Sequence, residues 1–174
     1  MDVGLANPVD LSPDSFRAAM RRFAGNVSVI TVGTGKDLSG LVATSAVSLS
    51  VDPPLMLVCV NRASSSWPLF GRYRHFGVNS LAPHHRHVAE RFSGAGGVKG
   101  ADRFSAGEWR SSPAGVPLLA DATVAIDCEI EDVIEKATHA ILIGRVRSIS
   151  LGENCGALVY WHGAYEALGV EGRL

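Results

Sequence analysis

The stretch from Gly40 to Val60, GLVATSAVSLSVDPPLMLVCV, predicts two strands joined by a stiff turn. Its first half, residues 43–50, consists of small and hydroxyl-bearing side chains, so a planar molecule can approach this backbone closely while the hydroxyls offer hydrogen bonds. Asp52-Pro53-Pro54 forms the turn, and residues 55–60 are almost continuously apolar, as in a strand buried on both faces. The segment is either one wall of a ligand site or an ordinary core hairpin.

The composition fits one globular domain over residues 1–174. Of the 174 residues, 47% are hydrophobic and 19% are charged, which is enough to bury a sizeable core. We expect residues 1–11 to form a flexible N-terminal arm. The 16 Lys and Arg nearly balance the 17 Asp and Glu, so the chain has no electrostatic attraction for nucleic acid or for an anionic membrane.

The lack of a recognisable targeting signal, together with the number and spacing of the cysteines, indicates a cytoplasmic protein. No apolar stretch is long enough to span a membrane, and the N-terminus lacks the basic flank and apolar core of a signal peptide. Cys59, Cys128 and Cys155 are odd in number and widely spaced, which argues against a disulfide framework. We expect buried, reduced thiols.

Strands outnumber helices along the chain. A capped helix is expected to begin at Ser12-Pro13 and bury an apolar face, and a second begins at Pro83 and ends in the Gly-rich, mobile segment 93–100. Strands are predicted over residues 27–32, 43–50, 55–60, 75–81, 122–134, 138–149 and 158–161. Consecutive strands lack the helical crossovers of a parallel sheet, so the fold class is mainly β, an antiparallel barrel with peripheral helices.

Several familiar catalytic motifs are missing from the sequence. It has no phosphate-binding loop with Lys-Ser or Lys-Thr, no Gly-x-Gly-x-x-Gly between strand and helix, and no Gly-x-Ser-x-Gly elbow. A Rossmann dehydrogenase, a nucleotide hydrolase and an α/β-hydrolase are therefore disfavoured.

Three polar features of the sequence can each be interpreted as functional or as structural. His84, His85 and His87 lack further ligands at a recognisable metal spacing, so we expect a solvated helix face and no metal. Residues 64–66, all serine, follow a strand and either hold a phosphate or form an ordinary polar turn. His139, at the mouth of an apolar strand, is either structural or functional.

Taken together in order, the motifs resemble the short-chain flavin reductase family, whose fold is an FMN-binding split β-barrel. The motifs are Phe16-Arg17-x-Ala-Met20, Val27-x-Val-Ile-Thr31, Ala43-x-Ser45, Ser48-Leu-Ser50-x-Asp-Pro-Pro54, Val78-Asn79-x-Leu81, Asp102-Arg103-Phe104 and Thr138-His139. Residues 61–68, NRASSSWP, resemble the reductase components of 4-hydroxyphenylacetate monooxygenase and of the pyrimidine-ring-opening monooxygenase.

The resemblance implies an NAD(P)H:flavin oxidoreductase. It would reduce FMN or FAD with NADH or NADPH, work as a homodimer and supply reduced flavin to a separate monooxygenase. The residues that it places at the isoalloxazine ring, the ribityl chain and the phosphate end are Val42, Ala43, Thr44, Ser45, Ser48, Ser50, Asn61, Ser64, Leu81 and Ala82. His139 would face the nicotinamide and orient it, with Tyr165 nearby.

Departures from the family pattern leave specificity open. Thr44 stands where Asn is usual, His85 where Gln is frequent, and Ala137-Thr138-His139 where Gly-Asp-His is common. The sequence selects neither FMN over FAD nor NADH over NADPH, and it does not name the partner monooxygenase. Two alternative functions remain open. One is a split-barrel enzyme that retains its flavin and reduces another acceptor, such as a cobalt corrinoid. The other is a non-enzymatic flavin- or haem-binding split-barrel protein.

Overall fold

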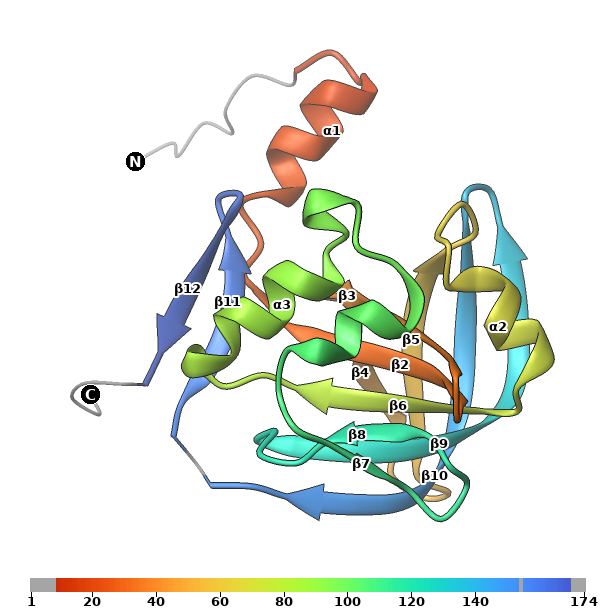
Figure 1. Cartoon of the computed structure of the whole chain (residues 1–174). Coiled ribbons are helices and arrows are strands. Elements are labelled where there is room, and N and C mark those ends of the chain that lie inside the picture. Colours follow the sequence, from red (N-terminus) through yellow and green to blue (C-terminus); the bar gives the residue numbers. More distant parts are fainter. Residues whose placement is uncertain (1–8, 154, 170–174) are drawn as a thin grey trace.

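The computed structural model describes residues 9–153 and 155–169, and its main element is a seven-stranded antiparallel sheet. The strand order is β3-β2-β6-β9-β10-β5-β4. The sheet coils around a core without closing, since β3 and β4 are its two edges (Figure 1). The predicted antiparallel split barrel with peripheral helices is confirmed.

The strands of this sheet are β2 (Ser28–Thr34), β3 (Asp37–Ala43), β4 (Val47–Ser50), β5 (Leu55–Asn61), β6 (His75–Ser80), β9 (Val124–Lys136) and β10 (His139–Leu151). Five of the seven strands follow the predicted ranges closely, β4 lies inside the predicted strand 43–50, and β3 was not predicted. The two long strands β9 and β10 form a hairpin whose turn immediately precedes His139. A register irregularity lies beside Gly144, where an added Cβ would come within 2.5 Å of the Phe76 ring on β6, so the glycine leaves room for this ring.

Two smaller sheets flank the barrel. One contains β1 (Gly25–Asn26), β11 (Ala157–Trp161) and β12 (Ala164–Leu168), and the other pairs β7 (Trp109–Ser111) with β8 (Pro117–Leu119). The sequence pattern predicted β11 but not the short strands β1, β7, β8 and β12. Strands this short depend more on pairing with distant segments than on an alternation of apolar and polar residues in their own sequence.

The helices are α1 (Pro13–Met20), α2 (Trp67–Arg72) and α3 (Arg86–Phe92), with 3₁₀ turns η1 (Pro83–His85), η2 (Ala95–Gly97) and η3 (Gly100–Ser105). Helices α2 and α3 pack against the sheet, whereas α1 stands away from it. The predicted cap of α1 is confirmed, because the Ser12 side chain accepts the Ser15 N–H at 3.1 Å and Ser15 returns a bond to the Ser12 N–H. The predicted Gly-rich loop 93–100 contains η2, and its Val98 carbonyl is held by Arg103.

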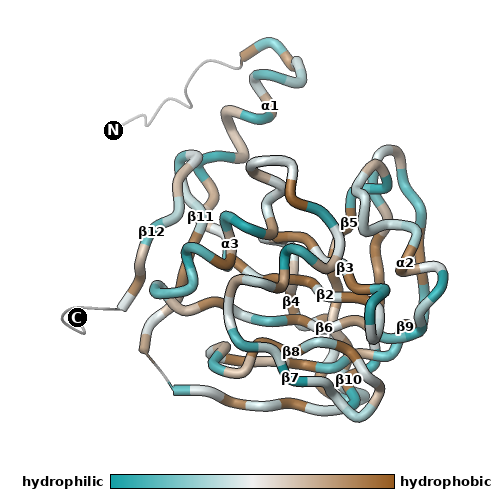
Figure 2. Tube along the Cα trace, viewed as in Figure 1, coloured by the Kyte–Doolittle hydropathy of each residue, from teal (hydrophilic) through white to brown (hydrophobic). Residues whose placement is uncertain are grey.

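The apolar side chains form two buried clusters. One lies between the halves of the large sheet and includes Ile30, Val58, Phe76 and Leu142. The other lies beneath α3 and η3 and includes Phe92, which packs edge-on against Phe104 with ring centroids 5.0 Å apart. Along the trace, hydrophobic positions concentrate in the central strands (Figure 2).

Three sequence expectations are corrected, two about burial and one about the extent of a strand. The α1 helix buries no residue, and Phe16 and Phe23 are 55% and 69% exposed, because the helix stands away from the barrel. Within β5, only Val58 and Val60 are fully buried, since one face borders a cavity. Residues 43–50 are not one strand, because the chain turns between Ala43 and Val47.

The remaining expectations on chain ends and thiols have mixed outcomes. Of the predicted arm, residues 1–8 lie outside the described residues, and residues 9–11 have no regular secondary structure. All three cysteines are free, but only Cys128 is fully buried and Cys155 is exposed. Burial, with a smaller contribution from Asp127, raises the pKa of the Cys128 thiol to about 12. No described helix is both long and apolar enough to cross a membrane.

His85 fastens the start of α3 to the barrel. Its side chain is 2% exposed, and its Nδ1 atom accepts the Ala82 N–H at 3.1 Å. The neutral ring must therefore carry its proton on Nε2, which lies 3.0 Å from Asp121 Oδ1 but is not oriented to donate a hydrogen bond to it. Burial lowers the pKa of His85 below its ordinary value of 6.5, and the Asp121 carboxylate opposes this effect.

We predict that His85→Gln weakens the dependence of stability on pH. Unfolded His85 takes up a proton near pH 6.5, whereas folded His85 does so only at lower pH, so acidification favours the unfolded chain. A glutamine can accept the Ala82 N–H without titrating. Between pH 7 and pH 5, urea unfolding of the variant should show a slope shallower by up to about 1.4 kcal/mol per pH unit, the value for one proton. His87→Gln, at an exposed position, is the control; equal slopes for all three proteins would contradict the prediction.

Candidate active site

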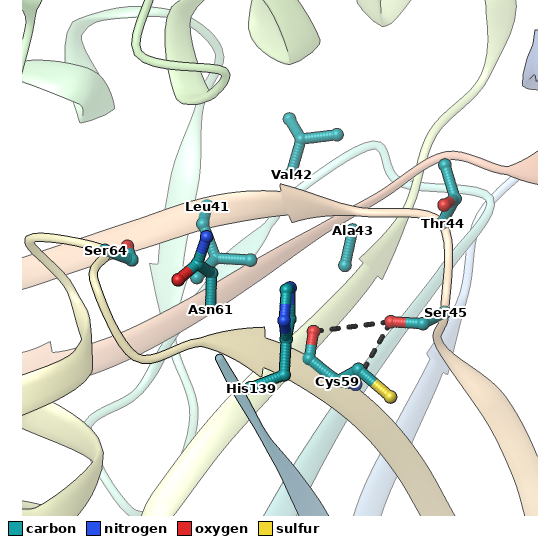
Figure 3. A pocket seen from close by; sticks show the side chains of 9 residues that line it. All are labelled: Leu41, Val42, Ala43, Thr44, Ser45, Cys59, Asn61, Ser64 and His139. Atoms are coloured by element: carbon teal, nitrogen blue, oxygen red, sulfur yellow. Dashed lines mark hydrogen bonds between the residues drawn. The ribbon is translucent and has the colours of Figure 1, made fainter. Parts of the chain in front are cut away.

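A cavity of about 360 Å³ opens where the large sheet fails to close, between the end of β3 and the paired strands β5 and β10 (Figure 3). Its volume falls in the range of small-molecule sites. The lining residues are Leu41, Val42, Ala43, Thr44, Ser45, Cys59, Asn61, Ser64 and His139. None of these nine residues is a carboxylate or a lysine, so the cavity offers hydroxyls, amides and one imidazole.

The β3 wall presents mainly backbone to the cavity. The Val42 side chain points away from His139, whereas the small Ala43 side chain lies on the His139 side of the strand (Figure 3). After Ala43 the chain leaves the sheet, and no acceptor is found among the described residues for the N–H groups of Thr44 and Ser45. These two groups are hydrogen-bond donors at the edge of the cavity.

Ser45 ties the β3 wall to β5. Its Oγ accepts the Cys59 N–H at 3.0 Å and lies 3.4 Å from the Cys59 carbonyl oxygen (Figure 3). These contacts span the gap between the two sides of the cavity and set its width at this end.

The turn after β5 forms the other end of the cavity. The Asn61 side chain accepts the Ala63 N–H at 2.9 Å, and the Ser64 Oγ accepts the Ser66 N–H at 3.2 Å. The Ser65 N–H has no acceptor among the described residues. The turn therefore combines hydroxyls with an unpaired backbone donor, an arrangement suited to an anion.

His139 reaches the cavity because β10 pairs with β5. In the antiparallel register His139 lies opposite Asn61, so residues 78 positions apart in the sequence meet at one point. The Thr138 Oγ1 lies 2.9 Å from His139 Nδ1, and this contact restrains the ring. The imidazole is exposed and available to a bound molecule.

The structure brings together seven of the twelve residues proposed from the sequence: Val42, Ala43, Thr44, Ser45, Asn61, Ser64 and His139. The other five lie elsewhere in the described chain.

Ser48 and Ser50 lie on the edge strand β4, and Leu81 and Ala82 are fully buried. Tyr165, on β12, packs against Tyr160 in the second core cluster with ring centroids 5.5 Å apart. None of these five lines the cavity, and their contact with a flavin stays a prediction.

Sequence reasoning missed two cavity residues, Leu41 and Cys59. Cys59 lies in an apolar strand, where its side-chain type gives no signal of a site. Its position opposite Ser45 becomes visible only from the pairing of β4 and β10 with β5.

A cluster away from this cavity has metal-ligand chemistry. Donor atoms of His84, His85 and Asp121 all lie within 4.8 Å of one another. Because Ala82 donates to Nδ1 of His85, the neutral ring holds a proton on Nε2 and has no lone pair there for a metal ion. We assign the cluster to anchoring α3, and the expectation of no metal stays a prediction.

A split barrel with a backbone-lined groove, hydroxyls at one end and a histidine at its rim defines a protein that binds a planar cofactor rather than one that attacks its substrate with a side chain. Residues 20–169 match the family described as flavin reductase like domain. The chain belongs to this family, and the predicted class, an NAD(P)H-dependent flavin reductase, is confirmed.

Individual relatives are similar over nearly their whole length. The chain is 35% identical to FMN reductase (NADH) RutF of Cronobacter sakazakii over 154 residues, covering 88% of this chain and 92% of the relative. BorF, the flavin reductase component of a bacterial two-component tryptophan halogenase, superposes with a TM-score of 0.83 at 30% identity over 90% of this chain and 98% of that one. The NADH:FAD oxidoreductase SgcE6 of Streptomyces globisporus was solved with NAD and FAD fragments. It superposes with a TM-score of 0.83 at 26% identity, over 92% of this chain and 96% of that one.

We predict that Ser45→Ala loosens the cavity. The substitution leaves the Cys59 N–H without its acceptor, so the free energy of unfolding in urea should fall by about 1 kcal/mol. Flavin affinity, measured by fluorescence titration, should fall several-fold because the two walls lose their connection. Ser150→Ala, at an exposed position of β10, is the control. Unchanged stability and affinity in Ser45→Ala would show that the contact between Ser45 and Cys59 does not set the width of the cavity.

Proposed function

We propose that the chain uses this groove to reduce FMN with NADH and then releases the reduced flavin to a separate oxygenase. The observation that carries the proposal is the meeting of three elements in one cavity: the β3 backbone, the Ser64 turn and His139. Support for FMN and NADH comes from the RutF relatives, and SgcE6 shows that a member of this fold also takes FAD.

The residues present fit a flavin. The small Ala43 side chain lets a flat ring approach the β3 backbone, and the cavity is open enough for a flavin that must leave after reduction. The polar turn at residues 61–66 suits the ribityl-phosphate end, and the β3 end of the cavity suits the ring.

The chain's own residues bind and orient rather than react. A bound flavin supplies the hydride-accepting chemistry itself. The N–H groups of Thr44 and Ser45, which lack acceptors among the described residues, are placed to stabilise negative charge on a ring lying against β3. Asn61 and Ser64 would hold the ribityl-phosphate end and fix the ring's position along the groove. Holding the nicotinamide and flavin rings together supplies much of the acceleration.

His139 is assigned to orienting the nicotinamide. It stands at the rim opposite β3, where a second planar molecule would enter, and the contact with Thr138 restricts its ring. This role needs a hydrogen bond or stacking contact rather than a proton transfer.

The function is tested by steady-state NADH oxidation with added FMN. The wild-type protein should turn over, and His139→Ala should slow hydride transfer at saturating NADH by about tenfold or weaken NADH affinity by a similar factor, because the nicotinamide is less well oriented. Stopped-flow absorbance of the flavin measures both quantities. His87→Ala, on the exposed face of α3, should behave as wild type.

Three outcomes would count against parts of this proposal. No turnover with FMN or FAD, and with NADH or NADPH, would reject the reductase function. Wild-type kinetics in His139→Ala would remove His139 from the site. Flavin retained through purification would favour reduction of another acceptor over release of reduced flavin.

The wider setting is also part of the proposal. BorF serves a two-component halogenase, so a flavin-dependent oxygenase or halogenase partner is the natural recipient of the reduced flavin. A cytoplasmic location, where reduced pyridine nucleotides are available, accords with this role.

We also propose that the chain is a homodimer. The apolar residues Phe16, Met20 and Phe23 on and just after α1 are 42–69% exposed, and Val47, Leu49 and Val51 around β4 are 48–89% exposed. An amphipathic helix that buries nothing in its own chain gains its stability by packing on another surface. A second copy offers that surface beside the open groove.

We predict that Phe16→Glu combined with Phe23→Glu yields a monomer. Placing two carboxylates in an apolar interface makes association costly. Multi-angle light scattering should give the mass of two chains for the wild type and of one for the variant. Lys36→Glu, in the exposed turn between β2 and β3, should remain dimeric. A monomeric wild-type protein would contradict the proposal.

A further inference from the structure

Behind the Ser64 turn lies a buried cation to which the proposed mechanism gives no role. Arg103, on η3, is 6% exposed and is the one buried Arg or Lys side chain among the described residues. A guanidinium keeps its charge under all ordinary conditions, so this position places a permanent positive charge in the protein interior.

All the hydrogen-bond partners of this guanidinium are neutral. Its Nε donates to the Val98 carbonyl at 3.0 Å, and its NH1 group donates to the Gly40 carbonyl and lies 3.3 Å from the Ser66 Oγ. No carboxylate within the described ranges 9–153 and 155–169 forms an ion pair with it. Burial alone lowers the pKa of Arg103, with no acid to oppose it. A buried charge without a counter-ion is costly, and such charges usually have a partner.

The partners of Arg103 lie directly behind the cavity. Gly40 precedes the β3 wall that begins at Leu41, and Ser66 closes the turn by donating its N–H to the Ser64 Oγ. The Ser66 Oγ also donates to the Gly40 carbonyl at 2.9 Å and lies 2.8 Å from the Ser39 Oγ. Arg103 therefore joins the wall and the turn, and its charge is separated from the Ser64 hydroxyl by one residue.

We propose that Arg103 sets the preference of this site for phosphorylated flavin: its buried charge, acting through Ser66, favours a phosphate at the Ser64 turn. The inference rests on the proposed function, since it requires a flavin in this cavity. Arg103 is a positioning and specificity residue and does not touch the ligand. The phosphate completes the charge balance that the protein leaves open, and the unpaired Ser65 N–H offers a direct donor at the same turn.

Comparison of FMN with riboflavin, which lacks the phosphate, tests this inference. Dissociation constants for both are measured by fluorescence titration at low salt. Arg103→Met and Arg103→Gln should weaken FMN binding about tenfold while leaving riboflavin binding within twofold, because only the phosphate responds to the lost charge. Arg103→Lys should keep the preference for FMN.

The controls separate the electrostatic role from a structural one. Arg91→Met removes a guanidinium that contacts Asp102 and Ser105 rather than Gly40 and Ser66, so it should leave both affinities unchanged. Equal weakening of FMN and riboflavin in the Arg103 variants would overturn the proposal, since it would show a purely structural role. Unchanged FMN affinity would overturn it as well.

The wild-type protein provides a test that needs no folded variant. It should bind FMN at least about tenfold more tightly than riboflavin, and the difference should shrink as salt is raised. Equal binding of the two flavins would overturn the assignment of Arg103 while leaving the flavin site intact. Binding of neither flavin would instead reject the proposed function.

Discussion

The architecture depends on the double pairing of β10. One edge of this strand bonds to β9 and the other to β5, so β10 joins the two halves of the large sheet. The same register places His139 opposite Asn61 and thereby assembles the rim of the cavity. A shift of one residue would turn the His139 side chain to the other face of the sheet. The long β9–β10 hairpin therefore controls both the closure of the core and the geometry of the site.

The sequence predicted what local pattern encodes. Alternating and continuous apolar runs located five strands of the main sheet and part of β4 but missed β3, and Ser12-Pro13 located the start of α1. The order of motifs then pointed to residues 42–45, Asn61, Ser64 and His139, which the fold does bring together. Burial was less predictable, because whether the apolar face of α1 is covered depends on tertiary and quaternary contacts that its own periodicity does not record.

Other parts of the site carry no sequence signal. Cys59 resembles any core cysteine until β5 is placed beside the turn at Ser45. Arg103 appears in a motif, Asp-Arg-Phe, but its burial behind the Ser64 turn follows from the packing of η3 against β3. Both depend on pairings between distant segments, which a single sequence does not reveal.

The groove exists because the sheet stays open between β3 and β5. Full hydrogen bonding along that seam would pair the N–H groups of Thr44 and Ser45, which have no acceptor in the part of the chain that the structure describes, and would add stability, yet it would fill the space that a flavin ring needs. Along the gap between β3 and β5, a gain in stability would therefore come at the expense of activity. Ser45 lies at this gap, since its Oγ contacts both the N–H and the carbonyl of Cys59. Stabilising substitutions selected for this protein should thus accumulate away from the seam, and those that fall on it should trade turnover for rigidity.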